Sequence, residues 1–544
     1  MFKHSSFGRS YGVFIILKEQ RFVKEPIVIE GRTKVVSIAA GLRHTLYLTA
    51  GNNVYSCGSN EYGQLGQSKS QSRPSSIEEF ENINISQIYA GDYFSLALTE
   101  EGKLFGWGRS DHHELLSEEE MIPKPRIIQS LNHHKIVQVA AGSNHVIALD
   151  KSGSIIVWGD NTHGQLGLGP GSGQMIKIPS IMVAMRSLPI SQIFSGSNHS
   201  GCLTHSGAIF VWGKNNFGQL GTGNSDSSQI PILLKTIRDQ GVKYVDMGED
   251  HSVALTYDGG VFSWGQGGHG QLGHGTISCQ NTPRKVFELM GNRTISLACG
   301  RKHTLVLTST RSVFGFGLNC NNQLGPSHEN SIRLPQTIKF GHVESYGSPN
   351  SISAGGDQSF CGYDSRSELA ELDCDKLSIP IFKMISFYQP RIGDACYQLK
   401  SSHSLTSDIK DILEEIFSSS SCLNSSFLAD DHYKTSSKYH GLSISKCSSS
   451  IARIFNHKES LNTAMDSLLD FLIPSLPSIP PDIETLRIVS RILSGSASEQ
   501  GSQSLQKSCT MEDFVVISNP ASELQIQSKI LKILPIAEGR PIFK

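Results

Sequence analysis

The sequence lacks any segment that would target it to a membrane. Its first apolar run, from Val13 to Leu17, has five residues and is too short for the core of a signal peptide. No stretch approaches the ~20 consecutive apolar residues that a membrane-spanning helix needs. We therefore expect a cytoplasmic protein with no membrane span, in which sequons such as Asn84-Ile85-Ser86 are chance matches.

Cysteine is sparse, and neither sign of charge dominates. The 544 residues include 11 cysteines, none in a C-x-x-C pair, so we expect reduced thiols and neither a disulfide framework nor a zinc site. With 48 basic and 49 acidic residues the net charge is −1, which provides no basic field for nucleic acid. No G-x-x-x-x-G-K-[ST] phosphate loop is present, and we expect no cofactor.

Glycine becomes scarce along the chain. Of the 52 glycines, only Gly362, Gly393, Gly441, Gly495, Gly501 and Gly539 lie after residue 360. Such a shift predicts two regions of different architecture.

The glycine-rich region is built from a repeat. A G-x-x-H box begins at Gly41, Gly142, Gly196, Gly248 and Gly300 and ends at His44, His145, His199, His251 and His303. Degenerate copies read Gly91-Asp92-Tyr93-Phe94 and Gly355-Gly356-Asp357-Gln358. Successive first glycines are 50, 51, 54, 52, 52 and 55 residues apart, so the sequence predicts seven units.

Two further boxes keep the same register. An aromatic-Gly box contains all four tryptophans, as Trp107-Gly108, Trp158-Gly159, Trp212-Gly213 and Trp264-Gly265, with Cys57-Gly58 and Phe316-Gly317 as variants. An N-x-x-G-Q-L-G box follows at 60–66, 161–167 and 215–221, and in part at 270–273 and 322–325. The second repeat departs here and reads Arg109-Ser110-Asp111-His112-His113-Glu114-Leu115-Leu116.

Short apolar strands flank Gly-containing turns between the first two boxes, as in Leu149 to Ile155. Units of about 50 residues hold four strands, and stacking them around an axis buries both faces of every sheet. The fold class we predict is an all-β seven-bladed β-propeller, followed by a smaller, mainly α-helical region. Two sets of apolar residues have helical spacing. The first is Ile409, Ile412, Leu413, Ile416 and Phe417. The second is Leu461, Ala464, Met465, Leu468, Leu469 and Leu472, where we expect Ser460 to cap the helix and Pro474 to end it.

The predicted organisation has five parts. Residues 1–27 form a divergent N-terminus with a remnant of a first repeat, and residues 28–360 form the propeller. Residues 361–406 are a linker, 407–494 the helical region, and 495–544 a flexible tail with a possible last helix. Ser6-Phe7-Gly8 in this N-terminus looks like the remnant of an N-x-x-G-Q-L-G box without its aromatic-Gly box, which puts the closure of the ring in doubt.

These boxes resemble the regulator-of-chromosome-condensation repeat. Thr282 to Gly291, Gly355 to Phe360 and Phe417 to Leu428, followed by Asp430-Asp431-His432-Tyr433, are similar to the small HERC family of HECT-type ubiquitin ligases. The resemblance implies a protein-binding half of such a ligase. The family's catalytic domain would lie beyond Lys544, so we expect this chain to bind without transferring ubiquitin.

Each candidate site residue has a structural interpretation as well as a functional one. We assign structural roles to the repeat residues and no catalytic, cofactor or metal role to any residue. The structural set is Gly41, His44, Trp107, Gly142, His145, Trp158, Gly196, His199, Trp212, Gly248, His251, Trp264, Gly300 and His303. Blades related by rotation hold their histidines too far apart to share one ion, so hydrogen bonds within or between blades are expected.

Three other patterns are weaker. Gly265 to Gly270 matches G-x-G-x-x-G, but it lies in an all-β stretch without the helix that a dinucleotide site needs. Three short clusters have no further ligands at the spacing of a zinc site, so we expect them to lie in solvated loops: His112-His113, His133-His134 and Asp430-Asp431-His432. Cys509 has no neighbourhood typical of a HECT nucleophile.

Loops on a rigid scaffold commonly carry recognition. The best candidates for a recognition surface are two segments that depart from the repeat pattern, Arg109 to Pro125 and Gly167 to Pro179. The alternative is that both segments are tolerated insertions. We expect protein partners, either ubiquitin-pathway substrates or a small GTPase. Guanine nucleotide exchange on a Ran-like GTPase and a purely structural scaffold are the competing functions.

Overall fold

The computed structural model describes residues 13–17, 35–186, 188–325, 329–338, 348–364, 407–418, 423, 458–468 and 472. The chain divides into two compact units. The first contains Met1–Met185, Ile190–Tyr388 and Tyr433–Thr435, and the second contains Arg186–Pro189, Gln389–His432 and Ser436–Lys544. The predicted five-part organisation stays a prediction.

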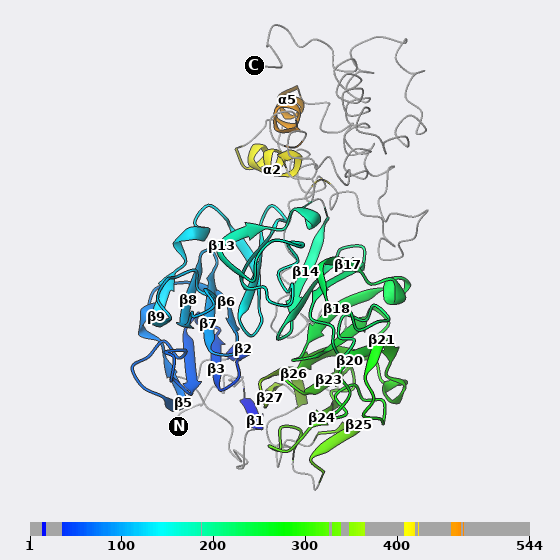
Figure 1. The fold of residues 1–544 in the computed structure, drawn as a ribbon. Coiled ribbons are helices and arrows are strands. Elements are labelled where there is room, and N and C mark those ends of the chain that lie inside the picture. Colours follow the sequence, from blue (N-terminus) through cyan, green and yellow to red (C-terminus); the bar gives the residue numbers. More distant parts are fainter. Residues whose placement is uncertain are drawn as a thin grey trace, which may run out of the picture. The chain divides into compact units, whose positions relative to one another are not determined.

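Six four-stranded antiparallel sheets make up most of the described part of the first unit, each with its strands in sequence order (Figure 1). The first blade is β2 (Val35–Ala40), β3 (His44–Thr49), β4 (Val54–Gly58) and β5 (Gln71–Ser76); the second is β6 (Ile85–Ala90), β7 (Phe94–Thr99), β8 (Leu104–Arg109) and β9 (Met121–Ile127); the third is β10 (Ile136–Ala141), β11 (His145–Asp150), β12 (Ile155–Asp160) and β13 (Met175–Ile181). The fourth is β14 (Ile190–Ser195), β15 (His199–Thr204), β16 (Ile209–Gly213) and β17 (Ser228–Leu233); the fifth is β18 (Val242–Met247), β19 (His251–Thr256), β20 (Val261–Gly265) and β21 (Gln280–Lys285); the sixth is β22 (Thr294–Cys299), β23 (His303–Thr308), β24 (Val313–Leu318) and β25 (Ser331–Thr337).

The predicted seven-bladed propeller is wrong, because only six four-stranded blades form within the described residues. The seventh repeat contributes two strands, β26 (Ser348–Gly355) and β27 (Gln358–Asp364), because no aromatic-Gly box follows Gln358 to supply a third. Its third strand is β1 (Val13–Leu17), which pairs antiparallel with β27. This three-stranded closing sheet contacts β2 of the first blade and β22 and β23 of the sixth. The N-terminal segment therefore takes part in the ring, although its repeat is incomplete.

The second strand of every blade is buried along its whole length. A sheet between two neighbours has both faces covered, so its central strand carries apolar or hydrogen-bonded side chains on both sides. Leu46 and Leu96 show no exposed surface, and the four tryptophans are equally buried. The core is thus a series of layers between blades.

The outermost strand of every blade contains a proline. The seven prolines are Pro74 in β5, Pro123 and Pro125 in β9, Pro179 in β13, Pro231 in β17, Pro283 in β21 and Pro335 in β25. Proline cannot donate a ladder hydrogen bond, so it is tolerated on an edge strand and blocks the addition of another strand there. These prolines protect the rim of the ring from edge-to-edge pairing.

Five short 3-10 helices lie after outer strands: η1 (Glu78–Phe80), η2 (Gln129–Leu131), η3 (Val183–Met185), η4 (Lys235–Gln240) and η5 (Phe287–Leu289). In the second unit the structure describes α2 (Ser407–Ser418) and α5 (Lys458–Ser467), which contact each other. Ile409, Leu413, Ile416 and Phe417 are buried, and Ser460 lies inside α5 instead of capping it. The prediction of a mainly helical region is wrong, because α2 and α5 are the only α-helices longer than one turn among the described residues there. Pro474 and Cys509 lie outside the described residues.

Candidate protein-interaction face

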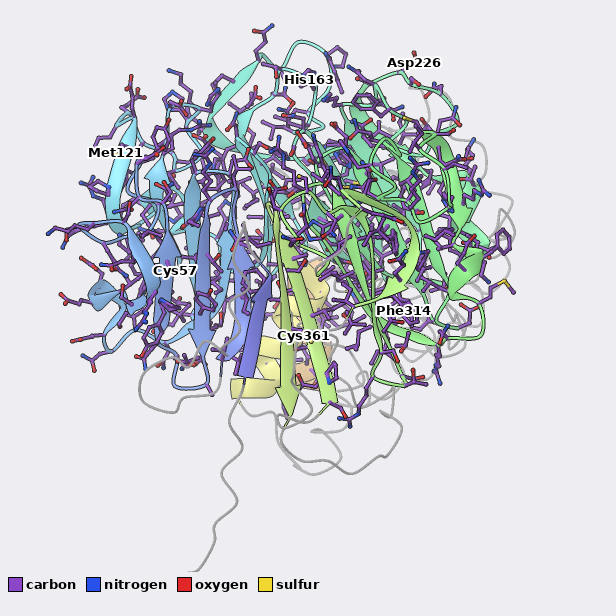
Figure 2. All side chains as sticks on the ribbon, turned by 90° about the horizontal axis from the view of Figure 1, so that it is seen from below. Cys57, Met121, His163, Asp226, Phe314 and Cys361 are labelled. Carbon is purple, nitrogen blue, oxygen red and sulfur yellow. The ribbon has the colours of Figure 1, made fainter. Side chains whose placement is uncertain are left out.

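Two kinds of loop share one face of the ring. In an antiparallel sheet the turn between the first two strands and the loop between the last two lie at the same end, so the G-x-x-H turns and the loops that follow the aromatic-Gly boxes are neighbours. Ser59 N, for example, donates a 2.9 Å hydrogen bond to Arg43 O. Figure 2 shows Met121, His163 and Asp226, from these loops or beside them, along one side of the ring. We call this side the box face.

All three sequence boxes meet between adjacent blades. His44 Nε2 lies 2.9 Å from Ser95 Oγ of the next blade, and Ser95 Oγ donates a 2.8 Å hydrogen bond to Gln64 O of the first blade. Trp107 Nε1 donates to the same carbonyl over 2.9 Å. Because the serine proton points at the carbonyl, His44 Nε2 carries the proton it donates. We call this set of contacts the interblade clip.

The clip recurs around the ring. The histidine-to-hydroxyl distances are 2.8 Å for His145 and Ser200, 3.2 Å for His199 and Ser252, 3.1 Å for His251 and Thr304, and 2.9 Å for His303 and Ser359. Burial lowers the pKa of His44, His145 and His303 to about 4 and of His199 and His251 to about 3. These histidines are therefore neutral donors near pH 7. That they serve only structural roles stays our proposal.

The joint between the second and third blades is apolar instead. Phe94 takes the histidine position and Val146 the hydroxyl position, and both are fully buried in one cluster. Trp158 Nε1 still donates to Glu114 O over 2.8 Å. The second repeat thus keeps the box geometry with different side chains.

The divergent loop of the second repeat follows the glycine-rich backbone without glycine. His113 has φ 57° and Leu116 φ 54°, where Gly63 and Gly66 of the first repeat have φ 74° and 69°. Side chains with a Cβ adopt this left-handed region at a free-energy cost of about 1 kcal/mol or more. The second repeat therefore holds a strained turn on the box face.

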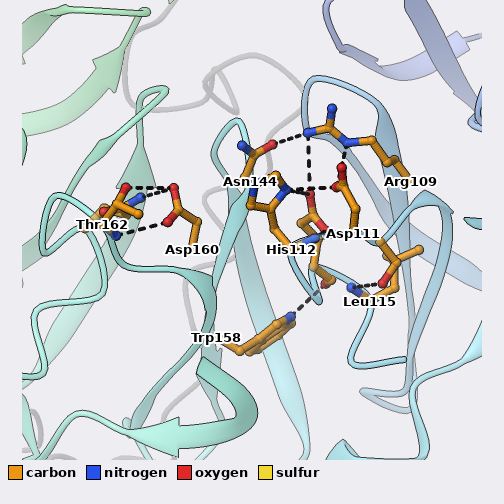
Figure 3. A network of polar contacts seen from close by, with 11 residues as sticks. Arg109, Asp111, His112, Leu115, Asn144, Trp158, Asp160 and Thr162 are labelled. Carbon is orange, nitrogen blue, oxygen red and sulfur yellow. Dashed lines mark hydrogen bonds and ion pairs between the residues drawn. The ribbon is translucent and has the colours of Figure 1, made fainter. Parts of the chain in front are cut away.

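A polar network surrounds Arg109 (Figure 3). Its Nε lies 2.9 Å from Asp111 Oδ1, and its Nη2 donates to Asn144 Oδ1 of the third blade. The guanidinium also lies 4.7 Å from the centre of the Tyr93 ring, within the range of a cation–π interaction. Arg109 therefore ties the divergent loop to two neighbouring G-x-x-H turns.

Glu114 occupies the position of the box glutamine. Its Oε2 accepts a 2.9 Å hydrogen bond from His112 N, as Gln64 Oε1 does from Tyr62 N. Burial raises the pKa of Glu114 to about 7, opposed by the nearby Arg109. A register alignment of the boxes would have revealed this carboxylate in a glutamine position from sequence alone.

A central channel of about 340 Å³ runs between the innermost strands of the blades and the closing sheet. Gln192 bridges its wall, donating to Val245 O over 2.7 Å and accepting from Val245 N over 3.1 Å, so a side chain satisfies an unpaired strand edge. At the box-face mouth, Arg301 Nε lies 2.9 Å from Glu249 Oε2, and partial burial raises the pKa of Asp92. The mouth is charged and polar.

The second divergent segment, from Gly167 to Pro179, lies against the fourth blade. Gly169 N donates a 2.8 Å hydrogen bond to Gln229 O, and Asn161 Nδ2 donates to Gly173 O over the same distance. Both candidate segments thus lie on the box face of adjacent blades.

The structure brings together few of the other candidates. His112 lies beside Asp111, His113 Nδ1 lies 2.9 Å from Ser117 O, and His134 pairs with Asp150 at 3.1 Å. Gly265 to Gly270 forms the end of β20 and a turn. Asp430 to His432 lies outside the described residues. A hydroxyl residue follows four of the five box histidines, as Thr45, Ser200, Ser252 and Thr304, and the prediction from sequence did not use this spacing.

Comparison with known proteins decides the family. The RCC1-like domain matches residues 5–361. The chain belongs to the RCC1-like domain family. Within the described residues, no helix of this RCC1-like protein is long and apolar enough to cross a membrane.

Two curated relatives of this RCC1-like chain extend the similarity beyond the ring. It is 38% identical over 495 residues to the rat probable E3 ubiquitin-protein ligase HERC4 and 35% identical over 501 residues to human HERC3. Each alignment covers 86% of this chain and 46% of the relative. The chain thus spans about half the length of the curated relatives it matches.

A solved structure supports the fold. Prp20p from Saccharomyces cerevisiae superposes with a TM-score of 0.58 at 24% identity, over 67% of this chain and 94% of Prp20p.

Proposed function

We propose that the chain recognises protein partners through the box face, as the substrate- or partner-binding part of a HERC-type ubiquitin ligase. The observation that carries the proposal is the placement of both divergent segments, Arg109 to Pro125 and Gly167 to Pro179, on this face. The similarity to two probable ubiquitin-protein ligases supports the ubiquitin pathway.

The box face offers what protein recognition requires. Tyr62 is 37% exposed, and its ring lies 5.1 Å from that of Tyr93 in an edge-on arrangement beside Arg109. Tyrosine and arginine dominate the binding energy of many interfaces. Clips and side-chain bridges hold this surface rigid, which lowers the entropic cost of binding.

The test compares partners captured by this chain with those captured by the matching region of rat HERC4. We expect shared partners, and we expect Tyr62→Ala to weaken their capture. Lys103→Ala is the control, because Lys103 is an exposed residue in a hairpin turn on the opposite side of the ring. Equal capture by the parent and both variants, or no partner shared with rat HERC4, would contradict the proposal.

Guanine nucleotide exchange is the second candidate. It rests on the likeness to Prp20p, whose structure was described together with its binding to Gsp1p and histones. We expect no acceleration of nucleotide release from a Ran-like GTPase. Stimulation of more than about tenfold, equivalent to ~1.4 kcal/mol of barrier, would favour exchange over ligase-partner recognition.

A further inference from the structure

The divergent loop of the second repeat gathers three side chains with metal-ligating atoms. Asp111, His112 and Glu114 hold one such atom each, all within 4.8 Å of one another. Asp111 Oδ1 lies 2.8 Å from His112 Nδ1, which lies 3.8 Å from Glu114 Oε1. Ligands around a tetrahedral zinc ion, at bond lengths near 2.0–2.1 Å, lie about 3.3 Å apart, so small rotations bring these atoms into range.

Glu114 provides an independent sign of a missing partner. It has no exposed surface, and its Oε1 has no hydrogen-bond partner. In the third repeat the equivalent atom is an amide, since Gln165 Nε2 donates a 2.9 Å hydrogen bond to Asp160 Oδ2. The second repeat thus presents a lone pair where other repeats present an N–H group, which has a partner at Gln165 and none at Gln64 and Gln323. A buried acceptor without a donor is unfavourable, and a cation would remove that cost.

Arg109 meets this need only in part. Its Nε contacts Asp111 Oδ1 at 2.9 Å, whereas its Nη2 stays 3.8 Å from Glu114 Oε1, beyond hydrogen-bond range. The guanidinium is also held by Tyr93 and Asn144. Two carboxyl groups and the imidazole of His112 therefore lie beside a single guanidinium group.

We propose that Asp111 Oδ1, His112 Nδ1 and Glu114 Oε1 bind a divalent transition-metal ion of the Zn²⁺ type, the proton that His112 Nδ1 donates to Asp111 in the metal-free loop giving way to the ion and the ring keeping its proton on Nε2. The imidazole ligand favours this class over Mg²⁺ or Ca²⁺. The side chains of Asp111 and His112 are 41% and 34% exposed, which leaves room for water as a further ligand. The bound ion would hold the loop, which Arg109 already ties to the third blade.

The experiment titrates the full-length chain with Co²⁺, followed by its visible absorption, and with Zn²⁺ by calorimetry. Glu114→Gln is the decisive variant because five other repeats carry glutamine at this position, so the fold should be retained. We expect it to weaken binding at least about tenfold, equivalent to ~1.4 kcal/mol. His112→Asn is the second variant, since Asn321 occupies its place in the sixth repeat, and it should act likewise.

Two controls make the outcome specific. His163→Ala, in the matching loop of the third repeat, should leave the affinity unchanged. Arg109→Gln, which copies Gln266 of the fifth repeat, should tighten binding several-fold because it removes a nearby positive charge. Failure of the parent chain to bind Zn²⁺ below about 0.1 mM, or equal binding by parent, Glu114→Gln and His112→Asn, would overturn the proposal. No partner protein is needed, so this result is separate from the test of partner recognition.

Discussion

Thr45 Oγ1 donates a 3.0 Å hydrogen bond to Gln358 Oε1, across 313 positions of sequence. Gln358 holds the histidine place of the seventh box and Thr45 the hydroxyl place of the first blade. The pair is therefore the version of the interblade clip that joins the closing sheet to the first blade.

A double-mutant cycle on this pair should reveal its contribution. Thr45→Val and Gln358→Met each remove one partner, and we expect a coupling of about 1 kcal/mol in the free energy of unfolding, typical of one buried hydrogen bond. Urea denaturation measures it. Effects that add within roughly 0.3 kcal/mol would mean that the bond does not stabilise closure.

The buried histidines predict loss of stability in acid. Their pKa values in the folded ring, about 3 to 4, lie below 6.5, so the unfolded chain binds more protons once the pH falls under 6.5. Stability should be complete above that pH and fall toward pH 4. Glu114 and Asp246, whose pKa values burial raises to about 7, act in the opposite sense but are fewer. Urea titrations from pH 8 to pH 5 test this.

A matched variant isolates one histidine. His251→Phe with Thr304→Val copies the natural Phe94 and Val146 joint, so the blades should still pack. We expect the slope of the unfolding free energy against pH to be smaller in this double variant. The decrease corresponds to the uptake of up to one proton on unfolding, about 1.4 kcal/mol per pH unit. An unchanged slope would show that His251 does not titrate on unfolding.

The tryptophans should be costly to truncate. Trp212→Ala and Trp264→Ala each remove a fully buried ring and a 2.9 Å hydrogen bond to the neighbouring blade, so we expect losses of roughly 3–5 kcal/mol in unfolding free energy. Trp264→Phe should lose less, because Phe316 fills the same place in the sixth repeat. Melting temperatures within a degree or two of the parent would contradict the buried assignment.

The rim prolines should suppress association. Pro179→Thr frees an edge strand in which Ile178 is 75% exposed, and we expect concentration-dependent self-association by light scattering. Adding Ile178→Lys should reverse it. A variant that stays monomeric at every concentration would show that proline is not what protects this edge.

The strained turn predicts an unusual gain. His113→Gly should raise the unfolding free energy by up to about 1 kcal/mol, because glycine accepts positive φ without strain. Gly63→His, the reverse change, should destabilise, since a Cβ there would lie 2.6 Å from Pro123 Cα. Thermal melts compare them, and equal losses in both variants would contradict this account.

The box spacing predicted seven blades and correctly located the six that are complete, because each box has a fixed place in the interblade clip. His44, Gln64 and Trp107 meet between the first two blades, so the spacing of the boxes in the sequence follows from these contacts. The prediction of a seventh four-stranded blade is wrong because one degenerate G-x-x-H copy is not enough to indicate a complete sheet. Nothing local in Val13 to Leu17 reveals that this strand pairs with β27.

The site was less predictable for a related reason. The divergence of Arg109 to Leu116 marked the loop, but which side chains converge depends on the backbone it retains. Placing Glu114 in the glutamine position required the register of the box, and the contact of Arg109 with Asn144 joins two repeats. Such pairings depend on the angle between blades, which one repeat does not encode.

The pairing of β1 with β27 has a consequence for synthesis on the ribosome. Residues 13–17 emerge early, whereas their partners at 359–363 appear hundreds of residues later. At about 5–20 residues per second, that delay is on the order of 20–70 seconds. Throughout it, the nascent chain exposes an unpaired apolar strand, and chaperones that bind such strands would be needed longest at this end.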